Sequence, residues 1–283
     1  MRRLFFAILM TAMLAFIGQP AMATDSWKFA EFSDMQSGSG TGPDTTRLTA
    51  TLDSIATKGV SFVITAGDNI SGYSDDNASQ WTTFKNTCES SGFSVGNSGT
   101  GTTVYTARGN HDANGGSSST ADAAWLTSMG QYLPQNGQVA SGSLVSEVGF
   151  SYSFVSNNAL IIALDDYRNG TYQSGNNAWL QTQLDYAKAN NLQVVVYGHG
   201  PAYEAVHSEC LAENQTARDT AIEAIIAAGG KVYFSGHDHI NAVAHTSVNN
   251  TDDFYEITSA WHTPGGYAFD GEYSSDYPYD QTN

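Results

Sequence analysis

The stretch Lys-Val-Tyr-Phe-Ser-Gly-His-Asp-His at residues 231–239 is the most informative part of this sequence. An apolar, β-prone run ends at a glycine, and two histidines follow it two residues apart. Because residues i and i+2 of an extended segment point to the same side, His237 and His239 are predicted to face one small volume. Two imidazoles at the end of a strand most often hold a metal ion, although a solvated loop that contains histidine is the alternative.

Four other strand-like runs end in residues able to bind a metal, which favours the metal interpretation. The runs are Trp27–Ser33, Val60–Thr65, Thr102–Ala107 and Leu192–Tyr197. The residues that follow them are Asp34 with Gln36, Asp68, Asn110 with His111, and His199. Segments with apolar residues at helical spacing lie between these strands. We therefore expect a layered α/β domain with its ligand groups at the strand ends.

Apolar periodicity also predicts the remaining elements. Helices are expected between Asp44, a candidate N-cap, and Gly59, and around Trp81–Cys88, Ala121–Met129, Trp179–Ala187 and Ile222–Ile226. Strands are expected at Phe150–Phe154 and Asn158–Leu164, and an antiparallel hairpin is expected from Ala242–Val248 and Phe254–Ser259. The stretch Gly92–Gly101 is expected to be a flexible connector.

The first 23 residues have the pattern of a secretory signal peptide. A basic start, Met1–Arg3, is followed by the apolar run Leu4–Ile17 and by the small-x-small cleavage pattern of Ala21–Ala23. The apolar run is short for a membrane span, which makes an uncleaved anchor the weaker alternative. We therefore expect residues 24–283 to form a single mature domain, secreted or periplasmic, with no integral membrane segment.

The charge balance is strongly acidic. The full sequence has a formal net charge of −17, and it becomes two units more negative once Arg2 and Arg3 are removed. Since basic residues supply the affinity for phosphate backbones, this balance disfavours long nucleic acid as a partner. The two cysteines, Cys88 and Cys210, do not make a disulfide framework; whether they pair stays open, as does the oligomeric state.

The five strand ends together supply a mixed set of oxygen and nitrogen donors. Carboxylate and amide oxygens beside imidazoles suit Mn, Fe, Zn or similar divalent ions better than soft copper(I). The set is too large for one tetrahedral metal, whereas two metals that share a bridging carboxylate would use it fully.

The ordered blocks resemble those of the calcineurin-like metallophosphoesterases. That family's pattern is Asp-x-His, Gly-Asp, Gly-Asn-His-Asp/Glu, a later His and Gly-His-x-His. This sequence has, in the same order, Asp34-Met35-Gln36, Gly67-Asp68, Gly109-Asn110-His111-Asp112, His199 and Gly236-His237-Asp238-His239. The resemblance implies an α/β fold of two packed mixed sheets flanked by helices, in α/β/β/α layers. It also implies a hydrolase that cleaves a small phosphate mono- or diester with a water activated by two divalent metal ions.

The resemblance also assigns a role to each matching residue. The implied ligands are Asp34, His239 and Gln36 for the first metal, Asp68 for the bridge, and Asn110, His199 and His237 for the second metal. His111 would contact the phosphate and protonate the leaving group. Asp112 would orient the His111 ring or, in the alternative reading, cap a helix.

Two departures from the family pattern bear on the metals. Purple acid phosphatases, a branch of the family, place a metal-binding tyrosine three residues after the bridging aspartate; Ser71 stands there in this sequence, with Tyr73 two further on, so no tyrosinate ligand is expected. Gln36 stands where the family pattern has a histidine, and its amide oxygen would be a weaker ligand that binds directly or only through water. The first metal is therefore expected to be held more loosely or to be of a different kind. A non-catalytic metal-dependent binding protein that keeps the fold is the alternative function.

Several other polar residues are expected to lie outside the chemistry. Asp165 and Asp166 are expected to form a solvated turn, and Arg108 a surface salt bridge. The same holds for three further histidines, His207, His245 and His262, which are expected to be surface or core residues.

Overall fold

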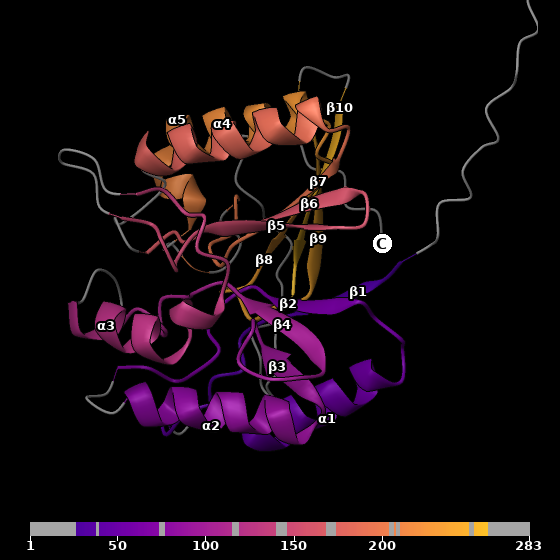
Figure 1. Cartoon of the computed structure of the whole chain (residues 1–283). Coiled ribbons are helices and arrows are strands. Elements are labelled where there is room, and N and C mark those ends of the chain that lie inside the picture. Colours follow the sequence, from indigo (N-terminus) through magenta and orange to yellow (C-terminus); the bar gives the residue numbers. More distant parts are fainter. Residues whose placement is uncertain are drawn as a thin grey trace, which may run out of the picture.

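The computed structural model describes residues 27–37, 40–73, 77–114, 119–139, 146–167, 174–203, 207, 210–248 and 252–259. Its strands form two sheets that pack face to face, and helices cover the outer side of each sheet (Figure 1). The predicted α/β/β/α layering is therefore confirmed. No helix in the described part of the chain is long and apolar enough to cross a membrane.

The first sheet has four strands in the order β1 (Phe29–Phe32), β2 (Phe62–Thr65), β4 (Thr102–Thr106) and β3 (Phe93–Val95). All three strand pairs are parallel. On its outer side lie α1 (Thr45–Ala56) and α2 (Asn77–Ser90), with α3 (Ser119–Ser128) beside α2 (Figure 1). As predicted, Asp44 caps α1: its carboxylate accepts a hydrogen bond from Arg47 N–H at 3.1 Å.

The second sheet has six strands in the order β5 (Tyr152–Ser156), β6 (Ala159–Ala163), β7 (Gln193–Tyr197), β8 (Val232–Ser235), β10 (Asp252–Thr258) and β9 (Ala242–Val248). Its four central strands run parallel, and β5 and β9 run antiparallel to their neighbours. Its outer side is covered by α4 (Ser174–Ala189) and α5 (Gln215–Ala227) (Figure 1). The expected hairpin of β9 and β10 is confirmed, and β10 also pairs with β8. Short 3-10 turns lie at Gly130–Tyr132 and Leu211–Asn214.

Aromatic side chains fill the space between the two sheets. Phe62 of β2 contacts Phe154 of β5 edge to face, with ring centroids 5.3 Å apart, and Tyr105 of β4 stacks on Phe154 at 3.8 Å. Phe29 of β1 meets Phe234 of β8 edge to face at 5.6 Å. Such pairs contribute roughly 0.5–1.5 kcal/mol each beyond the burial of their area. They hold the two sheets against each other and thereby set the positions of the strand ends.

Two points of the sequence analysis change. Gly92–Gly101 is not simply a flexible connector, because Phe93–Val95 within it are buried and pair with β4 as β3. No disulfide joins Cys88 to Cys210; both side chains are buried, Cys88 in the core cluster that includes the first sheet and Cys210 just before a 3-10 turn. The expected signal peptide, 1–23, and His262 lie outside the described residues.

Candidate metal centre

Five strand ends meet along one edge of the paired sheets. The loops after β1, β2 and β4 of the first sheet and after β7 and β8 of the second are hydrogen-bonded to one another. Asp34 N–H donates to Gly67 O at 3.0 Å, and Gly236 N–H donates to His199 O at 3.0 Å. His237 N–H donates from the second sheet to the Asp34 carboxylate at 3.2 Å. Parallel strands bring their carboxyl ends to the same edge, which is why these distant blocks become neighbours.

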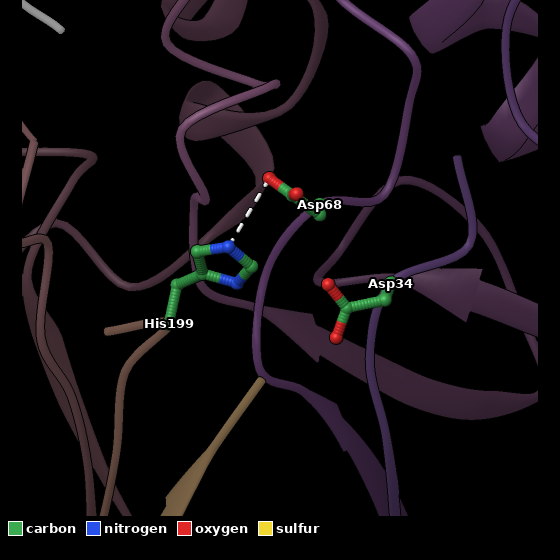
Figure 2. Close-up of side chains that lie close together, drawn as sticks. All are labelled: Asp34, Asp68 and His199. Carbon is green, nitrogen blue, oxygen red and sulfur yellow. Dashed lines mark ion pairs between the residues drawn. The ribbon is translucent and has the colours of Figure 1, made fainter. Parts of the chain in front are cut away.

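Asp34, Asp68 and His199 form the centre of the cluster (Figure 2). Each offers a ligand atom within 4.8 Å of those of the other two, and all three residues are buried. Nε2 of His199 lies 3.3 Å from Asp68 Oδ1, the contact drawn as a dashed line in Figure 2. Ser33 Oγ donates a hydrogen bond to Asp34 Oδ2, which orients that carboxylate.

A first group of donors lies on the Oδ2 side of Asp68. Nε2 of His239 lies 3.4 Å from Asp34 Oδ1 and 3.0 Å from Nε2 of Gln36. The same Gln36 nitrogen lies 3.3 Å from Asp68 Oδ2. The four residues thus present carboxylate, amide and imidazole groups to one small space.

A second group of donors is built around Asn110, on the Oδ1 side of Asp68. Oδ1 of Asn110 lies 3.0 Å from His199 Nε2 and 3.1 Å from His237 Nδ1. Since His199 Nε2 also contacts Asp68 Oδ1, the Asp68 carboxylate belongs to both groups, one oxygen to each.

The backbone is strained where these side chains converge. Four of the clustered residues have a left-handed backbone, with φ of 57° at Asp34, 50° at Asp68, 72° at His237 and 55° at His239. For residues with a Cβ this conformation costs about 1–3 kcal/mol each and persists only where the surroundings enforce it. Gly109 packs so closely that a Cβ there would lie 2.1 Å from Asp68 Oδ1. Strain and close approach of this kind are typical of a functional site.

The donor chemistry of the cluster fits divalent cations. The buried carboxylates of Asp34 and Asp68, with imidazoles and amides around them, form a set suited to Mn, Fe or Zn. Oε1 of Gln36 and Nε2 of His237 are buried and have no hydrogen-bond partner in the described part of the chain. A buried polar atom without a partner costs free energy, and coordination of a cation would satisfy both atoms.

The pKa shifts in the cluster also indicate that positive charge is stabilised there. Burial disfavours a charged His199 ring, but Asp68 outweighs burial and raises the pKa of His199 to about 10. Burial also opposes ionisation of Asp68, yet the adjacent His199 outweighs it and lowers the pKa of Asp68. Burial and the neighbouring His199 lower the pKa of His237 to about 2, so the His237 ring is neutral and offers a lone pair. A divalent ion would supply the positive charge that a proton on His199 otherwise provides.

His111 lies at the edge of the cluster with its side chain 30% exposed. Its backbone N–H donates to Asp68 Oδ1 at 2.9 Å, and its Nδ1 lies 2.8 Å from the carbonyl oxygen of Ser71. Because a carbonyl can only accept, this contact assigns a proton to Nδ1. Nε2 lies 3.8 Å from Asp68 Oδ2, and the residue lines the cavity above the cluster. The ring is placed to contact a group bound in that cavity.

Among the described residues, the hydrogen bonds of the Asp112 carboxylate go to two loops and not to the His111 ring. Its carboxylate accepts the backbone N–H groups of Asn69 at 3.0 Å, Gly109 at 2.9 Å and Ile70 at 3.2 Å. Burial and the nearby Asp68 raise the pKa of Asp112 to about 7. Asp112 therefore joins the loop after β2 to the loop after β4 and acts as a positioning residue.

Three charged residues near the strand ends are buried, contrary to expectation. Nε of Arg108 lies 2.9 Å from Asp165 Oδ2, and its Nη1 lies 2.5 Å from Asp122 Oδ1. Oδ2 of Asp166 accepts a hydrogen bond from Gly200 N–H at 3.1 Å. Arg108 and Asp165 are thus an internal ion pair, and Asp166 supports the loop that carries His199.

The cluster opens into a cavity of about 240 Å³. Its lining residues are Asp68, Tyr73, Asn110, His111, His207, His237 and His239. Tyr73 and His207 were not expected to line the cavity, because neither belongs to a recognised block. The His207 ring lies 5.1 Å from that of His237, and its backbone N–H donates to Asp238 Oδ1 at 3.1 Å. His245, in contrast, stacks on Tyr255 in the β9–β10 hairpin and does not line the cavity.

Solved structures share this architecture. A dimetal phosphatase from Danio rerio superposes with a TM-score of 0.61 at 14% identity, over 83% of this chain and 87% of that chain. A purple acid phosphatase from yellow lupin, Lupinus luteus, gives a TM-score of 0.54 at 14% identity, over 91% of this chain and 46% of that chain. At this level of identity the likeness shows the fold alone. Among curated protein sequences, no significant match is found.

The family is shown by the sequence itself. The model of the calcineurin-like phosphoesterase family matches residues 28–241, most of the chain. The matched range includes every block of the cluster, from Asp34 to His239. This chain therefore belongs to the calcineurin-like phosphoesterases, hydrolases that act on phosphate ester bonds.

Proposed function

We propose that this chain is an exported phosphoesterase that uses two divalent metal ions to hydrolyse a small phosphate mono- or diester. The observation that carries the proposal is the division of the cluster into two donor groups that share Asp68. Oδ1 of Asp68 faces His199 in one group, and Oδ2 faces Gln36 in the other. A carboxylate placed between two donor groups suits a pair of ions.

Each donor group has enough atoms to hold one ion. The proposed ligands are Asp34, Gln36, His239 and one Asp68 oxygen for the first ion, and Asn110, His199, His237 and the other Asp68 oxygen for the second. When bound, the two ions lower the pKa of a water molecule and neutralise charge on the phosphoryl oxygens. The mixture of oxygen and nitrogen donors supports Mn, Fe or Zn as the metals.

His111 is the residue proposed to act directly on the substrate. With the Nδ1 proton held by the Ser71 carbonyl, protonation of Nε2 turns the ring into a donor toward the cavity. In hydrolysis the water oxygen bonds to phosphorus, the bond to the leaving oxygen breaks, and that oxygen takes up a proton. A protonated His111 supplies that proton or a hydrogen bond to the phosphoryl group. Asp112 keeps the two neighbouring loops in register during this step.

The cavity and the charge support a small substrate. A volume of about 240 Å³ lies below the roughly 300–1,000 Å³ typical of pockets for drug-sized ligands. Such a cavity encloses a phosphoryl group and few further atoms. The net charge of −17 disfavours polymeric nucleic acid. Export is proposed from the signal-peptide pattern of residues 1–23.

A non-catalytic metal-dependent binding protein is the alternative function, and one residue favours it. Gln36 places a neutral amide where the family pattern has a histidine, which weakens the first donor group. His111 argues for catalysis instead, because its ring remains beside the cavity, where a binding protein has no need of a proton donor.

Assays of the purified mature protein test the proposal. We expect hydrolysis of p-nitrophenyl phosphate, bis(p-nitrophenyl) phosphate or both, loss of activity in chelator, and recovery with Mn²⁺ or Zn²⁺. Elemental analysis should find two metal ions per chain. Binding of metal without hydrolysis of either ester would support the alternative function. Export is tested by N-terminal sequencing of the extracytoplasmic protein, with Thr24 as the expected first residue.

A further inference from the structure

Tyr73 is an exposed aromatic residue at the rim of the cavity. It follows Asp68 by five residues, and 55% of its side chain is exposed. Its ring meets the His111 ring edge to face, with centroids 5.0 Å apart. Its hydroxyl lies 3.4 Å from Asn110 Nδ2, so the phenol extends from the second donor group toward solvent. Tyr73 is not among the metal ligands proposed above.

The backbone that carries Tyr73 is strained. Gly72 and Tyr73 are both left-handed, with φ of 56° and 48°. This conformation is unfavourable for a bulky residue such as tyrosine, and it marks positions that the surroundings enforce. At Gly72 a Cβ would lie 1.7 Å from the His111 carbonyl oxygen. The backbone at Gly72 therefore packs directly against His111, the residue proposed to act on the substrate.

Side chains from two other segments hold this strained turn. Gly72 N–H donates to Gln80 Oε1 of α2 at 3.1 Å, and Tyr73 N–H donates to Asn114 Oδ1 at 2.7 Å. Asn77 Nδ2 donates to the same Asn114 oxygen at 2.9 Å. The position of Tyr73 relative to His111 is therefore fixed by the fold, as preorganised binding groups are.

We propose that Tyr73 binds the leaving group of the substrate, and that this group is an aromatic ring attached directly to the ester oxygen. The inference rests on the proposed function and specifies its substrate class as aryl phosphate esters. The cavity of about 240 Å³ encloses the phosphoryl end, so the leaving group extends to the rim, part of which Tyr73 forms. Because the phenol hydroxyl lies beside Asn110, a ring attached to the ester oxygen would reach the phenol, whereas a base beyond a sugar would extend past it. Stacking on the exposed phenol then favours an aryl over an alkyl group.

Binding of two non-hydrolysable ligands, phenylphosphonate and methylphosphonate, tests this inference without requiring turnover. Calorimetry on the metal-loaded protein should give a lower Kd for phenylphosphonate than for methylphosphonate. Tyr73→Phe should keep that preference. Tyr73→Leu should weaken phenylphosphonate binding about 3- to 10-fold and leave methylphosphonate binding within about twofold. All three side chains carry a Cβ and therefore bear the same backbone strain. Tyr186→Leu, at a 49% exposed tyrosine of α4, is the matched control and should change neither Kd.

The following binding outcomes overturn the inference. Equal affinity of the wild type for the two phosphonates, or failure to bind either, excludes an aryl subsite. An equal loss for both ligands in Tyr73→Leu shows that Tyr73 only positions His111. A loss for both ligands in Tyr73→Phe shows that the hydroxyl contacts the phosphonate instead. Phenylphosphonate binding through Tyr73 in a protein that hydrolyses no ester would contradict the proposed function and leave the Tyr73 subsite standing.

Discussion

Oδ1 of Asp68 lies 3.3 Å from Nε2 of His199, while Oδ2 of the same carboxylate faces the opposite donor group. Asp68→Asn keeps the shape of the side chain and removes the charge shared by both groups. We expect kcat/KM to fall by about 10²–10³-fold or more, with fewer than two metal ions retained per chain. Kinetics and elemental analysis on the same preparation measure both effects. Asp53→Asn, at an exposed position of α1, should change neither; full turnover by Asp68→Asn would contradict the bridging role.

Gln36→His should strengthen the binding of the first metal ion. Gln36 Nε2 lies 3.0 Å from His239 Nε2 and 3.3 Å from Asp68 Oδ2, so a side chain at this position reaches the first donor group. Imidazole is a stronger ligand than an amide for most transition metals, and we expect the Kd of the weaker metal to fall by about tenfold. Metal titration of the apoprotein measures this change. Gln36→Ala should shift the same Kd in the opposite direction, and an unchanged Kd in both variants would show that residue 36 does not ligate.

Removing the guanidinium of Arg108 should destabilise the fold. Its Nε lies 2.9 Å from Asp165 Oδ2, with side-chain exposures of 0% and 1%. Arg108→Leu leaves the Asp165 carboxylate buried without its counterion, which costs roughly 3–5 kcal/mol. Urea unfolding measures this loss in the free energy of unfolding. The half-exposed pair of Arg47 and Asp44 provides a comparison, since Arg47→Leu should cost no more than about 1 kcal/mol. Equal losses in the two variants would argue against an internal role for Arg108.

Glu256 should make the free energy of unfolding fall as pH rises. Burial raises the pKa of this carboxyl from 4.5 to about 8, so the folded protein keeps a proton that the unfolded chain releases. The stabilising contribution is complete below pH 4.5 and is lost as pH rises toward 8. Ala202 N–H and Ser235 Oγ both donate to Oε1, which a glutamine can reproduce.

Glu256→Gln should therefore match the wild type near pH 5 and exceed its stability at pH 8, by an amount on the order of a few kcal/mol. Denaturant unfolding at the two pH values, with chelator present so that metal release does not contribute, measures the difference. Glu223→Gln, at an exposed position of α5, should behave as the wild type at both. A Glu256→Gln variant without added stability at pH 8 would contradict a neutral, buried Glu256.

The layered fold could be predicted because its signals are local. Apolar runs of four to six residues indicate strands, and the helices predicted between them indicate that these strands run parallel. Parallel strands bring their carboxyl ends to the same edge of the sheet. His237 and His239 both line the cavity, but their backbone is left-handed and not extended, so the alternation of a strand does not explain their placement. Asp44, in contrast, was recognisable as an N-cap, since its partner Arg47 N–H is only three residues away.

The features that the sequence analysis missed depend on partners far along the chain. Arg108 and Asp165 are 57 residues apart, and nothing local distinguishes such a pair from two solvated charges. Asp112 accepts N–H groups 42 and 43 residues upstream, a connection that no motif encodes. Tyr73 reaches the cavity only because the backbone at residues 72 and 73 is left-handed, which apolar spacing does not reveal. The residues that converge at the strand ends were predictable from the sequence, whereas the residues that position them were not.

The cluster joins parts of the chain that are far apart in sequence, since 203 residues separate Asp34 from His237. During synthesis from the N-terminus, the ribosome completes Asp34, Asp68 and Asn110 long before His237 and His239 emerge. A nascent chain that ends before β8 therefore lacks the imidazoles of both His237 and His239. With the ligands proposed above, neither donor group is complete before His237 and His239 have been synthesised, so the metal ions would not guide the folding of the residues that precede β8.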